Sequence, residues 1–484
     1  MTDDGWQRLD PRMMLIHPVR EVVRFLPPLI ALFVAGVASG GGRPWQLVGI
    51  LVPVALGLYR YFTTSYRIAG GRVELKRGLV GRHVTSTPLD RVRTVDLTAT
   101  AIHRVLGLTT LRIGTGTGAS GEDSDLELDG LPTARAEELR SELLRRSTVL
   151  DAPVPDEAAA PEPPVVELDW AWVRYAPLTT SGLVVTAGIL GVAGQILGSV
   201  DLSVDLDGAP RSVGLPGWTA VLLGLVVLVV LVCALSVAGY LVTNWGFALT
   251  RSRGAWHLRR GLVTTRETSL DEERVAGVSM GEPLGLRLAG GARLTAIVTG
   301  LHSDHPGSSV LVPPAPAPVV TRVAGAVLGT SAPPTAALTG HGPAATRRRY
   351  TRALGTAVAL AAAIAAGLVT LGAPWWALLL LLVLPVVAAL LAADRARALG
   401  HALVEEHVVA RSGSLARRRD HLQVGHVIGW NLRATWFQRR VGLTSLVATT
   451  AGGRQSVTLP DVPEPLAVGL ADETLPHVIR QFLA

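Results

Sequence analysis

A glycine-rich segment is the first place in this sequence where chemistry could occur. Residues 116–121 (GTGASG) have the glycine spacing of a dinucleotide-binding loop. In such a loop a helix follows directly and presents its N-terminus to phosphate. Here Glu122, Asp123 and Asp125 follow instead, and their negative charge would repel phosphate. We therefore predict a flexible hairpin loop and no nucleotide site.

Alternating acids after this loop could attract a divalent cation. Asp123, Asp125, Glu127 and Asp129 are two residues apart, so a strand would place them on one face. The alternative, which we favour, is a solvated edge strand that its charge protects from pairing with other chains. Another acidic group, at positions 201, 205 and 207, lacks the spacing of a cation-binding loop.

Histidines form two further groups. Neither group has the H-E-x-x-H spacing that sets two imidazoles on one helical turn, so we interpret them as exposed histidines of loops or strands. The groups are His401 with Glu405, Glu406 and His407, and His302 with His305. The sequence thus predicts no catalytic residue, no metal site and no cofactor, and we expect a protein that is not an enzyme.

Basic residues give a different signal, because they recur in three similar places close to apolar segments. Each cation beside an anionic leaflet contributes about 1 kcal/mol of attraction. The alternative is ordinary charge on edge strands together with the excess of arginine on the cytoplasmic side of a membrane. The candidate contacts with anionic lipid are Arg72, Lys76, Arg77, Arg82, Arg259, Arg260, Arg266, Arg417, Arg418 and Arg419.

These basic groups belong to three repeats of one sequence pattern, named repeats 1, 2 and 3. The repeats align without gaps on the anchor glycines Gly78, Gly261 and Gly413. Thirteen, twenty-nine and thirty-three positions after the anchor stand Arg91, Gly107 and Leu111 in repeat 1, Arg274, Gly290 and Leu294 in repeat 2, and His426, Gly442 and Leu446 in repeat 3. A shared register indicates duplication, which favours a scaffold or binding surface over a single active site.

Each repeat is predicted to form several short strands followed by one helix. A Gly-Gly turn at 70–71 between alternating segments is typical of a hairpin. From Pro132 the apolar spacing becomes that of a helix, with arginines in its last turn. The predicted strands are 72–76, 84–89, 92–97, 108–113, 125–128, 256–258, 262–265 and 294–298, and the predicted helices are 132–146 and those that start at Pro316 and Pro465.

Long uncharged segments precede each repeat. Only 17% of the residues are charged, against about 25% in an ordinary soluble domain. Because roughly 20 apolar residues cross the hydrocarbon as a helix, these segments predict six transmembrane helices in three hairpins. The run between Arg352 and Asp394 is divided by a predicted turn at 372–374. Prolines at 27, 28 and 53 leave a re-entrant pair as the alternative for the first hairpin.

The placement of arginine predicts the orientation of the spans. The short loops inside the hairpins carry almost no positive charge, whereas the segments on the other side carry many arginines, including residues 347–349. The positive-inside rule therefore places both termini and all three repeats in the cytoplasm of a bacterial cell, with the chain spanning the inner (cell) membrane several times. We expect no cleavable signal peptide. Cys233, as the single cysteine, excludes an internal disulfide.

The expected partners follow from charge and hydropathy. The net charge of +7 fits contact with an anionic leaflet, and the membrane lipids are partners of any integral protein. Nucleic acid is not expected, because the charge is dispersed and aromatic residues are scarce on the polar segments. No small-molecule substrate is evident. A protein partner or self-association is the remaining expectation.

Repeat 1 resembles the bacterial PH-like domain of membrane-flanked proteins. Residues 88–95 (PLDRVRTV) and 106–111 (LGLTTL) carry the resemblance. Repeat 2 keeps Arg274 and Val275 but has the acids of 271–273 where the motif has Pro-Leu-Asp, and repeat 3 has 441–446 (VGLTSL). The resemblance covers nearly the whole chain. It implies a seven-stranded PH-like barrel capped by a C-terminal helix, and it implies no reaction.

The predicted fold class is a mixed membrane protein, with six transmembrane helices in three hairpins and three tandem PH-like domains. Two linkers rich in proline and alanine are expected to be mobile. The predicted order is a basic cytoplasmic tail at 1–24, hairpin 1 at 25–62, PH-like domain 1 at 63–150, a linker at 151–170, hairpin 2 at 171–244, PH-like domain 2 at 245–330, a linker at 331–352, hairpin 3 at 353–393 and PH-like domain 3 at 394–484.

The predicted function is a non-enzymatic membrane scaffold whose cytoplasmic domains bind proteins at the membrane surface. A role in envelope homeostasis or antimicrobial resistance is what the resemblance implies. The alternative is lipid handling, in which the domains sense a headgroup at the inner leaflet. A protein scaffold predicts that strand-edge surfaces are essential, whereas lipid handling predicts that the arginine groups are.

Overall fold

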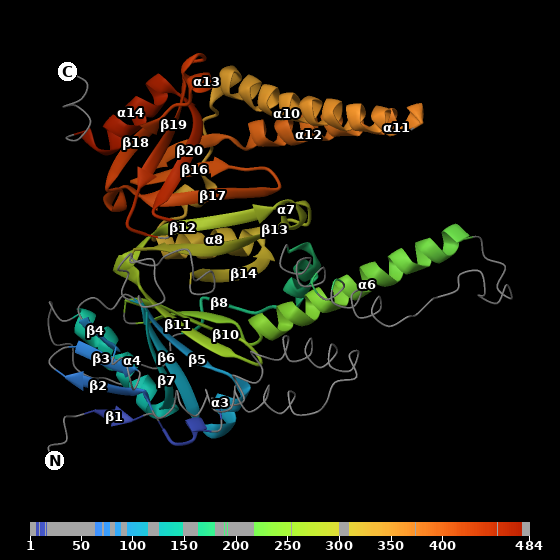
Figure 1. The fold of residues 1–484 in the computed structure, drawn as a ribbon. Helices are drawn as coiled ribbons and strands as arrows, with labels where there is room; N and C mark the ends of the chain where they lie inside the picture. The colour runs from blue at the N-terminus through green and yellow to red at the C-terminus, as the bar shows by residue number, and fades with distance from the viewer. Residues whose placement is uncertain are drawn as a thin grey trace. The chain divides into compact units, whose positions relative to one another are not determined.

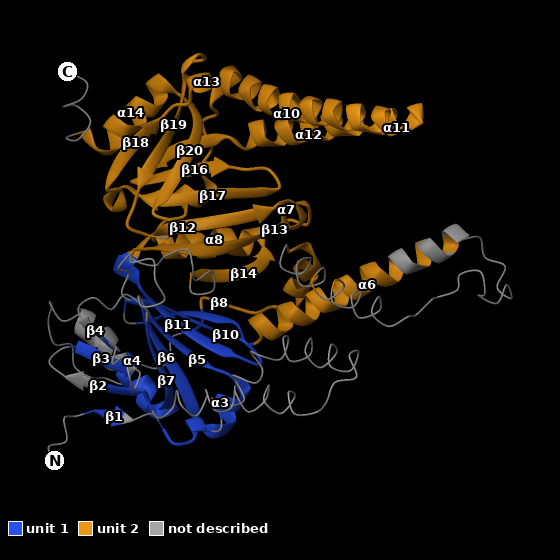
Figure 2. Cartoon of the chain, viewed as in Figure 1, with its two compact units in different colours: residues 1–164, 246–274, 300–302 blue, residues 165–245, 275–299, 303–484 orange. Residues whose placement is uncertain are grey.

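The computed structural model describes residues 6–16 without 9 and 15, residues 63–148 without 70–71, 78–82, 89–93 and 115–124, residues 163–179, 188 and 191, and residues 217–476 without 253, 300–308, 373 and 453 (Figure 1). The predicted first hairpin, residues 116–121, Asp123, the acids at 201–207, His302 and His305 lie outside the described residues. The chain divides into two compact units (Figure 2): residues 1–164, 246–274 and 300–302, and the remainder.

The first unit begins with an antiparallel sheet from repeat 1 and the N-terminal segment. Its strands are, in order, β1 (Gln7–Arg8), β2 (Ser65–Ala69), β3 (Arg72–Arg77) and β4 (His83–Pro88). Strands β2 and β3 pair with Ala69 opposite Arg72, which confirms the predicted hairpin. Val73 and Leu75 are buried while Arg72 is exposed, so the apolar alternation selects the core face of the sheet.

A further sheet of the first unit combines strands of two repeats. Repeat 1 supplies β5 (Thr94–Ala99), β6 (Leu108–Gly114) and β7 (Asp125–Pro132), and repeat 2 supplies β9 (Ala248–Ser252), β10 (Ala255–Arg260) and β11 (Thr265–Asp271). The strands follow the order β7-β6-β5-β11-β10-β9, with β5 and β11 antiparallel across the boundary between repeats. The compact units therefore divide the chain inside repeat 2, between Arg274 and Val275.

The core of the first unit lies between these sheets and one helix. Helix α4 (Thr133–Thr148) places Ala136 and Leu139 against buried leucines of β6 and β7, including Leu111 and Leu128. These side chains have exposed fractions of 0–1%. The predicted helix after Pro132 is thus confirmed, and its apolar face closes the open end of the repeat 1 sheets.

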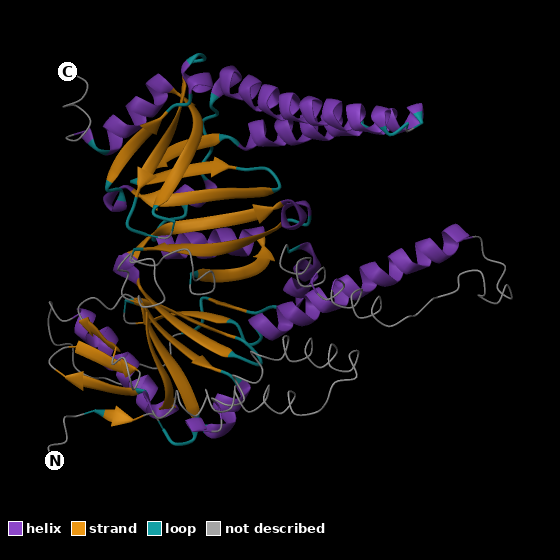
Figure 3. Ribbon diagram, in the orientation of Figure 1, coloured by secondary structure: helices purple, strands orange, loops and turns teal. Residues whose placement is uncertain are grey.

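The second unit combines repeats 2 and 3 in the same way (Figure 3). Strands β12 (Val275–Pro283), β13 (Gly291–Val298) and β14 (Val310–Pro316) join β15 (Gly400–Val404), β16 (His407–Ser412) and β17 (Ala416–Gln423) in the order β14-β13-β12-β17-β16-β15. Strands β18 (Gly429–Arg433), β19 (Leu443–Thr449) and β20 (Ser456–Pro463) form a separate sheet. The predicted helices after Pro316 and near Pro465 are α8 (Ala317–Leu328) and α14 (Glu464–Thr474).

Equivalent positions of the sequence repeats occupy equivalent places in the fold. The short helices α3 (Ala101–Leu106), α7 (Leu284–Leu288) and α13 (Trp436–Arg439) each precede an aligned glycine. These glycines, Gly107, Gly290 and Gly442, have φ angles of 68°, 69° and 64°. A residue with a Cβ is strained in this left-handed region, which explains why glycine recurs there. The aligned Leu111, Leu294 and Leu446 are all fully buried.

Three helical segments among the described residues are long and apolar enough to cross a membrane. They are α6 (Gly217–Asn244), α10 (Gly342–Thr370) and α11 (Trp375–Leu380) continuing into α12 (Val383–Ala398). Helices α10 and α12 lie side by side as a hairpin (Figure 1), and Gly372 with φ of 69° forms the turn between them. This confirms the turn predicted at 372–374.

Some predictions need correction. Residues 262–264 are not a strand but the turn between β10 and β11, because Gly261 with φ of 112° reverses the chain there. The part of the second linker expected to be mobile, residues 331–345, is packed instead. It forms α9 (Ala332–Thr335) and the start of α10, with Pro333, Pro334 and Ala345 buried. Proline-rich composition suggested mobility, but these prolines are buried, and α9 lies against α8.

The start of the predicted second hairpin also differs. Residues 171–178 belong to the 3₁₀ helix η2 (Trp170–Leu178), which follows the short strand β8 (Val166–Glu167). Trp172 and Tyr175 are buried, and Trp170 contacts Trp245 edge to face at 5.5 Å between ring centroids. This aromatic segment reads as apolar in sequence, yet it packs inside the second unit beside the end of α6.

Candidate functional site

Of the predicted lipid-contacting cations of repeat 1, Arg72, Lys76 and Arg77 lie on β3. Arg72 is exposed, and the Nζ of Lys76 lies 5.4 Å from the ring centroid of Trp6. Arg77 is the last residue of β3, and Arg82 lies outside the described residues. In repeat 1, therefore, the described cations lie along a single strand.

The cations of repeat 2 face one another across β10 and β11. Arg260 pairs directly with Arg266. Burial lowers the pKa of Arg260 to about 10, and the charge of Arg266 acts in the same direction. Arg259 is exposed, with its Nε 3.4 Å from Oε1 of Glu267. Glu267 also binds Arg140 of α4 at 3.0 Å, so this carboxylate partly neutralises the group.

The arginines of repeat 3 bind acceptors inside the second unit. Nη2 of Arg417 lies 2.7 Å from Oδ1 of Asp394, and Nε of Arg418 lies 2.8 Å from Oδ2 of Asp420. Arg419 donates to the carbonyl oxygens of Pro333 and Ala336 at 3.1 and 2.7 Å. Burial lowers the pKa values of Arg417 and Arg419. These side chains hold the packed linker and the hairpin, a role that sequence alone did not predict.

Asp394 collects donors at the end of helix α12. Arg287 of α7 donates to both of its carboxylate oxygens at 3.0 and 3.1 Å. Ser414 donates to Oδ2 at 2.9 Å, and Arg417 adds its ion pair at Oδ1. Because Arg287 lies on α7 of repeat 2 and Arg417 lies on β17 of repeat 3, the Asp394 carboxylate joins the end of α12 to both repeats.

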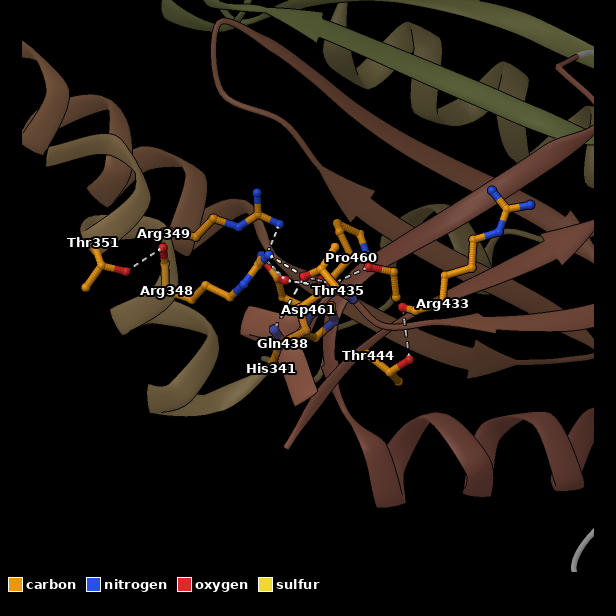
Figure 4. A network of polar contacts seen from close by, with 11 residues as sticks. His341, Arg348, Arg349, Thr351, Arg433, Thr435, Gln438, Thr444, Pro460 and Asp461 are labelled. Atoms are coloured by element: carbon orange, nitrogen blue, oxygen red, sulfur yellow. Dashed lines mark hydrogen bonds and ion pairs between the residues drawn. The ribbon is translucent and has the colours of Figure 1, made fainter. Parts of the chain in front are cut away.

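Asp461 plays the same part at the start of helix α10 (Figure 4). Nη1 of Arg348 lies 2.5 Å from its Oδ1, and Nη2 of Arg349 lies 2.6 Å from its Oδ2. Gln438 of α13 donates to Oδ1 at 2.8 Å. The Asp461 side chain is 1% exposed. We call Asp394 and Asp461 with these arginines, Ser414 and Gln438 the hairpin clamp, since they link the start of α10 and the end of α12 to the sheets.

The backbone at Asp461 is unusual. Its φ is 57°, a conformation that costs a non-glycine residue about 1–2 kcal/mol. Asp461 and Pro460 together oppose a single residue of β19, Ser445, so the strand bulges there. The corresponding bulge of repeat 1 contains Gly130, with φ of 75°. Repeat 3 therefore accepts strain where repeat 1 uses glycine, and the gain is a buried carboxylate aimed at the arginines.

A buried histidine pair lies beside the clamp. Nδ1 of His341 donates to the carbonyl oxygen of Pro460 at 3.0 Å, and the rings of His341 and His401 are 5.1 Å apart. Burial lowers the pKa of His341 to about 4, and the neighbouring His401 adds to the effect. Burial likewise lowers the pKa of His401. Both imidazoles are thus neutral at pH 7, and they pack in the interior beside the start of α10.

The interpretation of the 401–407 group as exposed histidines is wrong. His401 and His407 are each only 7% exposed. Glu405 and Glu406 form the turn between β15 and β16 and both have positive φ angles. Strand alternation places the two histidines against the interior. The polar residues beside them in the sequence had suggested an exposed segment instead. Among the described residues, no group of three or more metal-binding side chains converges.

Of the alternating acids, Asp125, Glu127 and Asp129 lie on an edge strand, as expected, and Asp123 lies outside the described residues. β7 is the last strand of its sheet. Glu127 lies 3.8 Å from Arg112, and Asp129 accepts a hydrogen bond from Thr110 at 2.5 Å. Asp129 also lies 3.3 Å from Nε2 of His103. These carboxylates interact with neighbouring side chains of the sheet.

One motif was missed in the sequence. Residues 277–281 (GVSMG) have the G-x-S-x-G spacing of a hydrolase nucleophile. That chemistry requires a sharp turn between a strand and a helix, whereas these residues lie within β12. Ser279 donates to Asp420 at 2.5 Å, and the adjacent His421 pairs with Val278, on the other face of the sheet. The strand geometry therefore gives Ser279 no histidine base.

The clamp residues share a signal that sequence reasoning could have used. In the sequence, the arginines at 347–349 indicate only the orientation of the spans, and Asp394 marks only the end of an uncharged run. A charge that directly bounds an apolar helix is also the natural place for an ion pair with the domain that follows. What no local pattern reveals is that Asp461, 67 residues after Asp394 in the sequence, occupies a bulge that faces Arg348.

Comparison with known proteins gives one family. A family model described as "Bacterial PH domain" matches residues 21–147 and 353–475, together more than half of the chain. Each matched range contains an uncharged apolar segment of the sequence followed by the strands and helix of one repeat, namely repeat 1 and repeat 3. Repeat 2 lies outside both ranges. Neither the curated proteins nor the solved structures give a match.

Proposed function

This chain belongs to the bacterial PH domain family, and from that premise we propose that it is a non-enzymatic scaffold at the bacterial inner membrane. In this proposal, six transmembrane helices in three hairpins carry three tandem PH-like domains in the cytoplasm, where both termini also lie. The domains bind protein at the membrane surface. The apolar helices α6, α10 and α11–α12 support the membrane part of the proposal.

The observation that carries the proposal is the use of sheet edges. Strand β5 of repeat 1 pairs with β11 of repeat 2, and β12 of repeat 2 pairs with β17 of repeat 3. Main-chain pairing at a sheet edge is a general way for one segment to recognise another. A protein that already joins its own repeats by such edges has the surface chemistry to add strands from a partner.

The hairpin clamp supports a mechanical role over a chemical one. Both carboxylates of the clamp are occupied by arginine and amide or hydroxyl donors. A carboxylate held in ion pairs with two arginines is poorly suited to act as an acid or base. It is well suited to hold a transmembrane hairpin and a cytoplasmic sheet in one orientation.

Lipid handling is the second candidate, and the cations of repeats 1 and 2 favour it. Arg72 and Arg259 are exposed, so they are available to headgroups. In repeat 3, in contrast, Arg417, Arg418 and Arg419 are engaged within the protein. Any lipid contact through arginine is therefore expected to involve Arg72 and Arg259 and not the 417–419 group.

A cross-linking pull-down of the full-length protein from native membranes, analysed for both protein and lipid, tests the proposal. A near-stoichiometric protein that persists in an Arg72→Gln/Arg259→Gln variant would support the scaffold. Enrichment of one anionic lipid class without a protein, lost in the same variant, would favour lipid handling instead. The two substitutions are at exposed sites, so the fold should tolerate them.

A further inference from the structure

Two pairings join one repeat to the next, and both have the same register. Positions are counted from the anchor glycine of each repeat. In the first unit, Thr94 at position 16 of repeat 1 is opposite Leu270 at position 9 of repeat 2. In the second unit, Gly277 at position 16 of repeat 2 is opposite Leu422 at position 9 of repeat 3. The two junctions between repeats are therefore equivalent strand pairings.

The strands at the two ends of the series are counterparts of the junction strands. β18 of repeat 3 corresponds to β5 and β12, yet within the described residues it pairs only with β19. β4 of repeat 1 corresponds to β11 and β17, and in the described part of the chain it pairs only with β3. Each outer edge presents alternate N–H and C=O groups that an antiparallel strand could bind.

Side chains of β18 are exposed where their counterparts are buried. At position 19, Leu97 and Met280 are 5% and 4% exposed in the internal junctions, whereas Leu432 is 42% exposed. At position 15, Ala276 is fully buried and Ile428 is 66% exposed. An apolar edge of this kind marks an interaction surface in a soluble region of a protein.

The same difference occurs on β4. At position 8, Ser269 and His421 are 1% and 0% exposed in the internal junctions, whereas Ser86 is exposed. Val84, two residues earlier, is 49% exposed. At both ends of the series of three repeats, the residues that a further junction would bury are therefore exposed to solvent.

We propose that β4 of one molecule pairs with β18 of a second molecule of this chain, in the register of the internal junctions. That register places Leu432 opposite Val84 and Trp430 opposite Ser86. A cross-strand pair of two exposed aliphatic side chains stabilises such a pairing. The contact is head-to-tail, so it generates a ring if the rotation closes and an open filament if it does not.

This inference deepens the proposed scaffold function by naming its partner as a second molecule. A second molecule is the expected occupant because the chain already makes this contact internally. β11 and β17, the counterparts of β4, pair with β5 and β12, the counterparts of β18. A strand from a different protein is the competing occupant, and the experiment below separates the two.

Cysteine cross-linking in native membranes tests the register. In a Cys233→Ser background, His83→Cys and Arg433→Cys are placed on separate molecules, at positions 5 and 20 of the proposed junction. Thr98→Cys with Arg266→Cys is the matched internal pair, because these residues are opposite each other at positions 20 and 5 of the junction between repeats 1 and 2. Leu432→Cys with His83→Cys is one residue out of register and points to opposite faces.

The expected result is a disulfide-linked dimer from the first pair, and a ladder of higher multiples when both cysteines are on one chain. The out-of-register pair should give none. Closure of the internal pair without any dimer would overturn the inference. So would capture of a different protein at Arg433→Cys in place of a second molecule.

A surface variant separates this inference from the scaffold proposal. Leu432→Lys places a charge on the edge and should abolish the ladder, while Leu466→Lys, at an exposed leucine of α14, should leave it intact. A ladder that survives Leu432→Lys contradicts pairing through β18. If no ladder forms but a distinct protein partner is still recovered from the membranes, the inference fails and the scaffold stands. If a ladder forms and no different protein is recovered, the scaffold consists of this chain alone.

Discussion

At the residue scale, buried charge and buried imidazole concentrate where the α10–α12 hairpin meets the repeat 3 sheet. Asp461 is nearly inaccessible and is held by two arginines. His341 lies beside it, bound to the carbonyl oxygen of the preceding Pro460. Loss of a partner leaves such a group buried and unpaired, which is costly. Each therefore yields a prediction about stability.

Replacement of Asp461 should be strongly destabilising. Asp461→Asn keeps the size of the side chain but leaves Arg348 and Arg349 without a counter-charge, which we expect to lower the free energy of unfolding by about 3 kcal/mol. Glu464→Gln, an exposed carboxylate at the start of α14, is the control and should change it by less than about 0.5 kcal/mol. Denaturant unfolding of the purified protein in detergent, followed by tryptophan fluorescence, measures both. Equal stability of the two variants would contradict the clamp.

His341 predicts a dependence of stability on pH. Its pKa is about 4 in the folded protein, below the ordinary value of 6.5, so the unfolded chain binds the proton more tightly. The stabilising contribution is therefore complete above pH 6.5 and is lost as the pH falls from 6.5 to about 4, by about 3 kcal/mol at the lower limit. His341→Asn retains a donor for Pro460 and should flatten this part of the profile. Identical profiles for the two proteins between pH 7 and 4 would disprove the assignment.

At the scale of elements, the anchor glycines explain why the repeats turn where they do. Gly261 and Gly413 have φ angles of 112° and 101°. A Cβ on either would lie 2.0 or 2.5 Å from a backbone oxygen across the turn. The turn that precedes β11 and β17 thus requires glycine, and these are the strands that form the junctions between repeats.

Replacement of an anchor glycine should loosen a junction. Gly413→Ala is expected to lower the free energy of unfolding by about 2 kcal/mol, because the backbone must shift to relieve both the φ strain and the contact with Ala416. Gly425→Ala is the matched control, since a Cβ there meets no atom within 4 Å. Hydrogen exchange of the β16 and β17 amides reports the loss locally. Protection that is unchanged in Gly413→Ala but reduced in Gly425→Ala would reverse this account.

At the scale of the whole molecule, the chain alternates apolar helices with sheets that cross the boundaries of the repeats. Two compact units result, each containing one junction between repeats. The clamp joins the α10–α12 hairpin to the sheets of the second unit, and the proposed self-association would repeat the same junction between molecules.

Membrane orientation can be checked directly. The positive-inside rule predicts that the turn between α10 and α11 lies outside the cytoplasm and the end of α14 inside it. In a Cys233→Ser background, Leu371→Cys should react with a membrane-impermeant maleimide in intact cells with a permeabilised outer boundary. Glu473→Cys, an exposed site, should react only after the cell membrane is opened. Labelling in the reverse order would invert the proposed topology.

Sequence determined much of this protein because its signals are local. Hydrophobic spacing predicted the helix at 132–146 and many of the strands, and uncharged length predicted the α10–α12 hairpin with its turn at Gly372. The aligned repeats predicted that Gly107, Gly290 and Gly442 are equivalent. Glycine recurs at this position because the backbone there is left-handed, and a residue with a Cβ would be strained. These properties depend on a few neighbouring residues, so a linear pattern contains them.

Tertiary structure alone decided which partners the charged residues and the strand edges have. The grouping of arginines at 417–419 suggested a lipid surface, but the fold gives them Asp394, Asp420 and the carbonyls of the linker. The repeats suggested separate domains, but β5 pairs with β11 and β12 with β17. Backbone hydrogen-bonding groups are the same in every residue, and the acceptors of an arginine can be a hundred residues away. Neither choice leaves a pattern in the sequence, so both appear only when the chain is folded.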